Sequence, residues 1–347
     1  MYIRKIIIAV ALLGLIAMGA FAYYVYTTVF TPNTRFDTSQ AFVFIPTNAD
    51  AHDLQNAVKP YIKDWDSFIA VANRKGYFSN IKPGRYQLTK GMNNNDIVNT
   101  LRSQNLPLSV SFNNQKTIHH LAGRIAQQIE ADSTSLVHTM LDASYLSAKQ
   151  FTADNALAMY IPNTYEFYWN TSAEKFKERM WKEYQAFWND SRKQKAAALN
   201  LTELEVISLA AIVQKETAIV AERPRVAGVY VNRLKRGMLL QADPTVIYTI
   251  KKEKNDFDLV VKRVLYKDLE IDSPYNTYKY TGVPPGPIAM PDISSIDAVL
   301  NYEQHNYFYF VANPDNPGHH IFAKTLAQHN RNKQKYIRWV NQQRIMR

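Results

Sequence analysis

The chain is 347 residues long, which allows two domains, and its 41 lysines and arginines against 30 acidic residues give a net charge of +11. Because the sequence contains no cysteine, it excludes a disulfide, a thiolate nucleophile and a zinc–thiolate site. The positive charge favours an anionic partner, which leaves nucleic acid, an anionic membrane and an anionic wall polymer to be distinguished.

The N-terminal stretch indicates the compartment. Ile6–Phe30 contains no charged residue and follows Arg4 and Lys5. As a helix it would be roughly 37 Å long, enough to cross a bilayer. Ala20–Ala22 could serve as a cleavage site, so a removed signal peptide is the alternative. Because the apolar run continues through the aromatic Tyr23–Tyr26, we expect a single-pass inner-membrane anchor, with the N-terminus cytoplasmic and the body periplasmic. An exported body makes nucleic acid an unsuitable partner.

The next part of the chain is predicted to be a small α/β unit. Residues 31–40 are expected to form a polar linker, and residues 41–112 the unit itself. The expected elements are a strand at 43–45, a turn into a strand at 83–88, and helices at 51–58, 65–75 and 95–102.

A second set of elements follows from residue 106. A strand is expected at 106–113, and helices at 117–131 and 133–143. The helix expected at 172–188 is rich in aromatic residues, which we interpret as core rather than as a carbohydrate platform. Strands are expected at 307–311 and 320–322, followed by a terminal helix.

One predicted helix carries an acid on its apolar face. Thr202–Glu205 is a capping-box pattern that begins the helix. Leu209, Ile212 and Val213 share a face with Glu216, so the carboxyl is directed toward the interior. Burying an ionised carboxylate costs several kcal/mol, so such a group pairs or takes up a proton. A carboxyl protonated near neutral pH suits a general acid in sugar chemistry. The alternative is a helix-end glutamate that reaches solvent or an arginine.

Several ordered motifs surround this acid. They are Gln214–Thr217, Asn232–Leu234, Gln241–Tyr248, Tyr275–Tyr278 and Gly282–Ile288. Together they resemble the catalytic domain of the endolytic murein transglycosylases, the MltG (YceG-like) family. Gln and Ala at positions 214 and 242 depart from the family pattern. The resemblance is strong from residue 161 to the C-terminus and looser before it.

The resemblance implies an α+β fold in four parts. Residues 1–30 would be the cytoplasmic tip and transmembrane anchor, 31–40 the linker, 41–112 a LysM-like subdomain and 113–347 the larger YceG-like catalytic domain. The LysM-like unit could contact glycan or act as a spacer, because a fold does not dictate a function.

The resemblance also implies an activity. A lytic transglycosylase of this family cleaves the MurNAc–GlcNAc β-1,4 bond of nascent peptidoglycan strands, leaves 1,6-anhydroMurNAc ends and so terminates glycan elongation. Glu216 would act first as acid and then as base, without metal or cofactor. The expected partners are glycan strands, the inner membrane and peptidoglycan synthases. The residues expected to contact sugar or orient the acid are Gln241, Asp243, Tyr275, Asn276 and Tyr278.

Other readings remain open. A water-using muramidase would need a second carboxyl, for which Asp243 and Glu222 are the nearest candidates. A membrane-tethered glycan-binding or scaffold protein of wall synthesis would need no catalysis. The adjacent histidine pairs 119–120 and 319–320 cannot both face one metal from a helix, and the sequence lacks the serine-hydrolase elbow and the phosphate-binding glycine loop.

Overall fold

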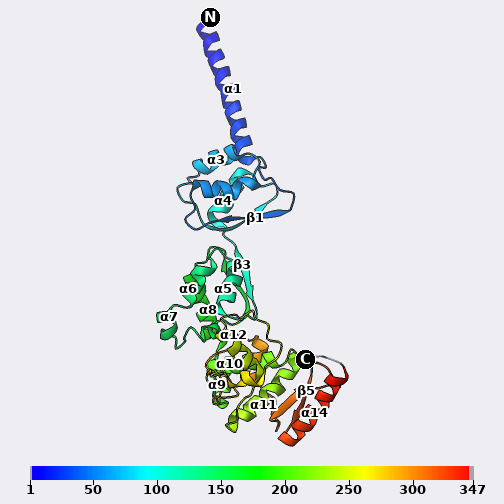
Figure 1. Ribbon diagram of the computed structural model, residues 1–347. Helices are drawn as coiled ribbons and strands as arrows, with labels where there is room; N and C mark the ends of the chain where they lie inside the picture. Colours follow the sequence, from blue (N-terminus) through cyan, green and yellow to red (C-terminus); the bar gives the residue numbers. More distant parts are fainter. Residues whose placement is uncertain (1, 344–347) are drawn as a thin grey trace. The chain divides into compact units, whose positions relative to one another are not determined.

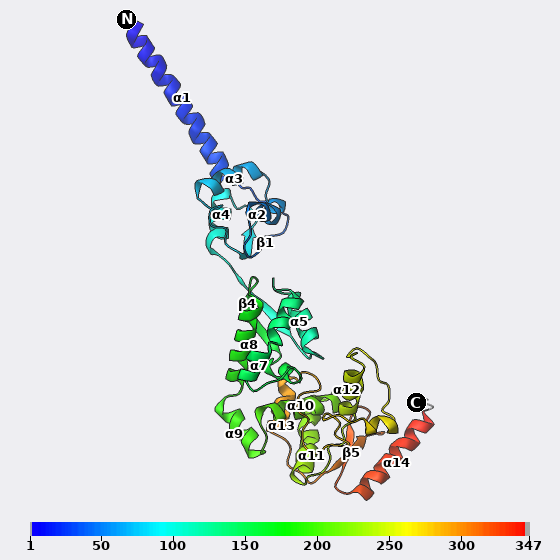
Figure 2. The same ribbon diagram turned by 60° about the vertical axis from the view of Figure 1, so that its left-hand side comes forward.

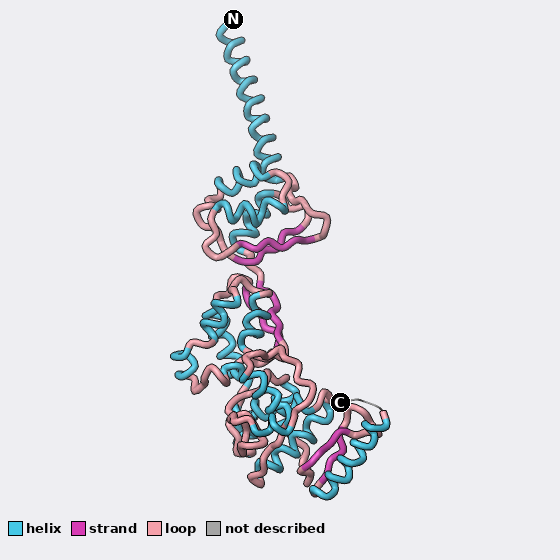
Figure 3. The backbone as a smooth tube through the Cα atoms, viewed as in Figure 1, coloured by secondary structure: helices cyan, strands magenta, loops and turns pink. Residues whose placement is uncertain are grey.

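A computed structural model of the chain describes residues 2–343, which form two compact units. Unit 1 comprises the chain up to Val110 together with Gln128–Ala131 and Tyr165–Ser172. Unit 2 comprises Ser111–Gln127, Asp132–Thr164 and the chain from Ala173 onward. The fold is mixed α+β, as predicted, with helices more abundant than strands (Figure 3).

The N-terminal helix α1 (Figure 1) spans Tyr2–Phe30. It has no buried residue. Most of its apolar side chains are exposed, although Val29 near its end packs against the core of unit 1, and by length and composition the helix could cross a membrane. This agrees with an N-terminal anchor. At its end α1 contacts helices α3 and α4 of unit 1.

Unit 1 packs three helices against a two-stranded sheet. Strands β1 and β2 pair antiparallel, with Gln40 opposite Thr89 and Ile45 opposite Gly84. Alternation places Val43, Tyr86 and other apolar side chains on the helix-covered face, where they are buried. The elements are β1 (Gln40–Ile45), α2 (Ala51–Val58), α3 (Trp65–Arg74), β2 (Gly84–Thr89) and α4 (Asn94–Ser103).

Part of the predicted linker belongs to unit 1. Asn33 is 4% exposed, its amide N–H donates to the Met92 carbonyl, and its side chain hydrogen-bonds Asn94 at 2.7 Å. Thr34 makes an isolated bridge with Ile62. The polar composition that suggested a linker therefore reflects buried groups that are satisfied by hydrogen bonds.

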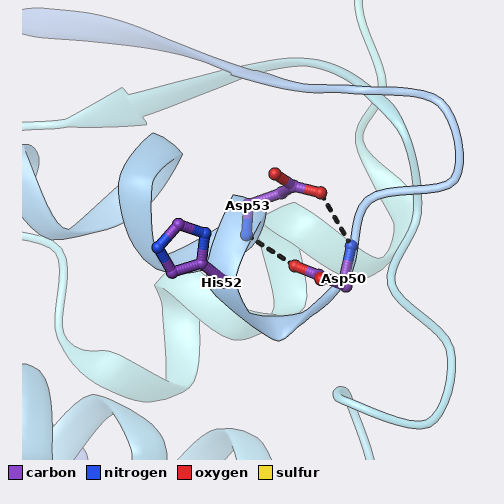
Figure 4. Close-up of side chains that lie close together, drawn as sticks. All are labelled: Asp50, His52 and Asp53. Atoms are coloured by element: carbon purple, nitrogen blue, oxygen red, sulfur yellow. Dashed lines mark hydrogen bonds between the residues drawn. The ribbon is translucent and has the colours of Figure 1, made fainter.

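The helix α2 begins with a capping box that gathers charged groups at its N-terminus (Figure 4). The Asp53 N–H donates to Asp50 at 2.8 Å, and the Asp50 N–H donates to Asp53 at 3.1 Å. With His52, these side chains are the one group of three among residues 2–343 whose spacing could hold a metal ion, and all three are exposed. The helix cap accounts for both carboxylates.

The helix predicted at 117–131 is shorter in the structure. Helix α5, Ile118–Ala126, ends before Glu130, whose N–H donates to the Trp169 carbonyl and whose carboxylate accepts from Thr47 N–H and Oγ1, both at 2.6 Å. These tertiary hydrogen bonds hold 128–131 in unit 1 and prevent further helix. The chain passes between the units along β3 (Pro107–Phe112) and β4 (Asn163–Tyr168), which pair with each other.

Unit 2 is built around α10, Glu203–Glu216. All residues from Val206 to Val213 are buried, because α10 is packed against α11, α12 and α13. Its capping box at Thr202 forms as predicted. The other helices are α6 (Ser133–Met140), α7 (Ala143–Ala148), α8 (Ala173–Phe187), α9 (Asp190–Ala198), α11 (Arg223–Lys235), α12 (Asp243–Glu253) and α13 (Ile293–Leu300).

A β-hairpin and the last helix complete unit 2 (Figure 2). Strands β5 (Tyr309–Ala312) and β6 (His320–Ala323) pair antiparallel. Helix α14, Leu326–Gln342, packs against both strands. On α11, Asn232 Nδ2 donates to the carbonyls of His305 and Tyr307 at 2.8 and 3.0 Å, which fixes the segment that leads into β5.

Candidate active site

Glu216 is the last residue of α10 and lies at a pocket of about 300 Å³. The apolar turns before it are buried, and Thr217 leaves the helix in an extended conformation, so the carboxyl is held at the helix end while remaining partly accessible. The pocket is lined by Glu216, Tyr230, Arg233, Gln241, Asp243, Tyr278, Tyr309, Phe310, Leu326 and His329. It therefore joins α10, α11, the start of α12, β5 and α14.

The carboxyl of Glu216 has one direct hydrogen bond from the described residues 2–343. The Tyr230 hydroxyl donates to Oε1 at 2.7 Å, and the tyrosine is 1% exposed. Burial raises the pKa of Glu216 to about 7, the Tyr230 hydrogen bond and the charge of Arg233 oppose that rise, and the charge of Asp243 adds to it. A carboxyl with this pKa is present in both protonation states near neutral pH.

Arg233 places a positive charge at this pocket without neutralising the acid by direct contact. Its Nε donates to the Phe308 carbonyl and one terminal nitrogen donates to the Leu240 carbonyl, both at 2.7 Å. The side chain is 8% exposed, and its guanidinium lies 5.4 Å from the Tyr309 ring centroid. Arg233 thus fixes the backbone on two sides of the pocket. It affects Glu216 only through the electrostatic effect of its charge, without a direct hydrogen bond.

The turn before α12 presents Gln241 and Asp243 to the pocket. Gln241 has φ of 46° and donates its N–H to the Thr277 carbonyl, and the Ala242 N–H donates to Thr277 Oγ1. Thr245 Oγ1 lies 2.8 Å from Thr277 Oγ1 and completes this buried network. The turn is therefore held rigidly by polar groups away from solvent.

Asp243 is oriented by Tyr278. The tyrosine hydroxyl donates to Asp243 Oδ1 at 2.5 Å, and both side chains line the pocket with Glu216 and Gln241. The structure thus brings together four of the sequence-predicted site residues: Glu216, Gln241, Asp243 and Tyr278.

The other two predicted residues, Tyr275 and Asn276, do not line the pocket. Asn276 is fully buried, and its amide donates to the carbonyls of Leu269 and Ile271 at 2.9 and 2.8 Å. Tyr275 is 1% exposed and packs on Tyr248, with the ring centroids 4.7 Å apart. Both side chains hold the loop that carries Tyr278, and neither faces the acid.

The second-carboxyl candidate Glu222 is also engaged elsewhere. It is 8% exposed and accepts hydrogen bonds from His320 N and Nδ1 at 2.8 and 2.7 Å. Burial acts to raise the pKa of Glu222, but these hydrogen bonds outweigh it and the net pKa is lowered. Gln214, which departs from the family pattern, accepts from Asp292 N–H and Ser295 Oγ at the start of α13.

Sequence reasoning missed much of the pocket. Tyr230 and Arg233 stand three residues apart on α11, a helical spacing that places both on one face, and this signal was available. Tyr309, Phe310 and His329 come from the C-terminal segments and carry no local signal of a site. His329 stacks on Tyr309 at 5.3 Å, and burial, Lys333 and Arg233 lower its pKa.

Larger cavities lie away from Glu216. One of about 660 Å³ is lined by Trp181, Tyr184 and Lys149, among others, and one of about 580 Å³ by Asn163 and Thr164. The core interpretation of the aromatic residues of α8 is confirmed for Tyr184, which is 4% exposed, whereas Trp181 is only half-buried and lines the first cavity. Glu216, the carboxyl whose pKa burial raises to about 7, lines neither of these cavities, so the pocket at Glu216 is the chemical candidate.

Comparisons with known proteins agree over most of the chain. The model of the YceG-like family matches residues 43–335. An endolytic murein transglycosylase of Bacillus subtilis is 31% identical over 94% of this chain and 93% of that protein. An endolytic murein transglycosylase of Streptococcus pneumoniae is 24% identical over 97% of this chain and 65% of that protein. The crystal structure of a YceG-like protein from Listeria monocytogenes has a TM-score of 0.56 and 28% identity, covering 85% of this chain and 99% of that one.

Proposed function

This chain belongs to the YceG-like family, and we propose that it is an endolytic murein transglycosylase. It cleaves the MurNAc–GlcNAc β-1,4 bond within nascent peptidoglycan strands and produces 1,6-anhydroMurNAc ends. Such an enzyme is a carbon–oxygen lyase, and cleavage within a growing strand terminates its elongation.

The observation that carries this proposal is the state of Glu216. A pKa of about 7 leaves roughly half of the carboxyl protonated at neutral pH, so the same group can donate a proton and later accept one. A solvent-exposed glutamate with an ordinary pKa would be almost entirely ionised and a poor acid.

The reaction balances without water. Protonated Glu216 gives its proton to the glycosidic oxygen, and the bond between that oxygen and C1 of the muramyl sugar breaks. The C6 hydroxyl of the same sugar then attacks C1, forms the O6–C1 bond and returns its proton to Glu216. Because the nucleophile is intramolecular, its proximity supplies much of the rate enhancement.

The rest of the pocket supports the charges of these steps. Tyr230 stabilises the Glu216 carboxylate that exists between the two proton transfers. Asp243, fixed by Tyr278, supplies a negative charge that favours the oxocarbenium-like transition state. Gln241 is exposed at the pocket and has an amide suited to sugar hydroxyls.

Two rival functions make different predictions. A water-using muramidase would give reducing ends, and Asp243 is then the carboxyl available as a second group in the pocket. A non-catalytic scaffold would need no carboxyl with a raised pKa. The raised pKa of Glu216 therefore argues against a scaffold function.

The setting of the enzyme follows from α1 and the basic residues before its apolar run. Arg4 and Lys5 favour a cytoplasmic N-terminus, so the body lies on the outer side of the cytoplasmic membrane, where nascent glycan is made. Unit 1 acts as a LysM-like contact for the glycan strand, and peptidoglycan synthases are candidate partners.

The test is Glu216→Gln with product analysis by mass spectrometry. The variant keeps the size of the side chain but cannot transfer a proton, so cleavage falls by roughly 10²–10⁴-fold while the protein folds. The control is Glu222→Gln, which removes a carboxyl that lies outside the pocket and keeps activity per folded molecule. Reducing ends from the wild type would identify a muramidase, and Glu216→Gln with wild-type turnover would refute the assignment.

A further inference from the structure

Three lysines line a second pocket of about 200 Å³, called here the lysine pocket. Lys116 reaches it from the segment before α5, Lys215 from the last turn of α10 and Lys251 from the last turn of α12. Its apolar lining includes Ile247 and Ile288. The pocket therefore combines positive charge with an apolar wall, and it is not part of the catalytic pocket described above.

The positive charge of this pocket is only partly balanced. Lys116 pairs with the exposed Asp258. Among residues 2–343, Lys215 and Lys251 have no ion pair, and Lys251 Nζ donates only to the Phe257 carbonyl at 3.3 Å. An anion placed between these two ammonium groups would gain attraction that the protein itself does not supply.

The pKa of Lys215 is consistent with this arrangement. Burial lowers it, the charges of Lys251 and Lys116 lower it further, and Asp292 only partly opposes them. The like charges of the three lysines therefore destabilise one another.

The lysine pocket and the catalytic pocket are adjacent along the chain at two points. Lys215 precedes Glu216, and Asp243 precedes Pro244, which lines the lysine pocket. Consecutive Cα atoms are about 3.8 Å apart, and successive helical side chains diverge by about 100°. The two pockets therefore lie beside each other at the C-terminal end of α10 and at the N-terminal end of α12. A three-residue extended peptide spans roughly 10 Å.

We propose that the lysine pocket binds a carboxylate of the peptide stem carried by the muramyl sugar in the catalytic pocket. This inference rests on the proposed function, because murein supplies a sugar and an anionic peptide on one molecule. Lys215 and Lys251 contact the carboxylate, and the apolar wall receives an aliphatic side chain of the stem. The enzyme therefore selects stem-bearing glycan over glycan from which the peptides have been removed.

The composition of the pocket favours a carboxylate over a lipid phosphate. Phosphate sites are typically built from arginine forks or from backbone N–H groups at a helix N-terminus. No arginine lines this pocket, and the nearest helix N-terminus contributes Pro244, which has no N–H. Single ammonium groups and an apolar wall instead suit a carboxylate attached to a peptide.

The test measures binding, so that it does not depend on cleavage. In full-length protein with Glu216→Gln, the Kd is measured for a short murein glycan with tripeptide stems and for the same glycan after amidase removal of the stems. Adding Lys215→Gln and Lys251→Gln is expected to weaken binding of the stem-bearing glycan by about 3- to 10-fold and to leave the stripped glycan unchanged. A control variant, Lys254→Gln, removes a charge from the exposed end of α12 outside the pocket and leaves both Kd values unchanged.

The proposal would be overturned if the two lysine substitutions weakened binding of the stem-bearing and the stripped glycan equally. It would also be overturned if the Glu216→Gln protein bound both glycans with the same Kd. Tighter binding of inorganic phosphate than of the stem, lost with the same two lysines, would assign the pocket to a phosphate and also overturn it. If the wild type cleaves no murein but the stem-dependent difference in Kd persists, the proposed catalysis fails and the stem site stands.

Discussion

The hydrogen bond from Tyr230 to Glu216 allows a sharp test of how the acid is tuned. Tyr230→Phe removes one hydroxyl and keeps a ring that is 1% exposed and lies edge-on to Phe310, with the centroids 5.9 Å apart. Packing is therefore largely conserved, and the main change is the loss of the 2.7 Å bond to Glu216 Oε1.

The expected magnitude follows from the strength of that bond. A hydrogen bond to a charged group contributes about 1.5–3 kcal/mol, and one pKa unit corresponds to about 1.4 kcal/mol. Because the bond favours the ionised carboxylate, its loss raises the pKa of Glu216 by about 1–2 units, from about 7 to roughly 8–9. The carboxylate formed during cleavage is also less stable, so kcat falls by about 10- to 100-fold.

The assay is the pH profile of kcat/KM on soluble murein strands. Cleavage begins with protonated Glu216, so activity falls as pH rises through the pKa, and this alkaline limb moves upward in Tyr230→Phe. Tyr278→Phe is the matched comparison, because it removes a hydroxyl from the same pocket without contacting Glu216, and its limb moves less. An alkaline limb in Tyr230→Phe that stays in place or moves to lower pH would refute the reasoning.

Three further predictions concern the same unit. Asp243→Asn removes a negative charge that raises the pKa of Glu216, so the alkaline limb of kcat/KM moves to lower pH, and an upward shift would contradict the electrostatic account. In the wild type, the pKa of Glu216 is about 7 in the folded protein and 4.5 ordinarily, so the folded state binds a proton that the unfolded state releases, and the wild type loses stability as the pH rises between these values. Glu216→Gln removes this pH-dependent contribution. Thermal melts should therefore show the variant gaining on the wild type between pH 5 and pH 8, by at most about 3 kcal/mol, and a constant difference would exclude this linkage. Gly228→Ala places a Cβ 2.4 Å from the Glu303 carbonyl oxygen, so unfolding should cost about 1–3 kcal/mol less, and an unchanged Tm would show that the backbone yields freely.

Local chemistry determined many element boundaries in advance. The helix predicted at 51–58 is α2, Ala51–Val58, and the start of α10 follows the Thr202 capping box, because caps and helical periodicity depend on residues within one or two turns. The prediction for α5 was wrong at its end, since the Glu130–Trp169 hydrogen bond joins residues far apart in sequence. Propensity cannot anticipate such a contact.

For the candidate active site too, some features could be predicted from the sequence and others depend on the tertiary structure. An apolar stripe that ends in Glu216 identified a carboxyl with a raised pKa from the sequence, because burial of α10 is readable from its spacing. The sequence motif alone does not show that Tyr278 lines the pocket whereas Asn276 is buried within its own loop. Which hydroxyl reaches Glu216 was decided by tertiary packing, since Tyr230 acquires its role only when α11 is packed against α10. Side-chain direction in irregular segments depends on contacts between distant parts of the chain, and those exist only in the folded protein.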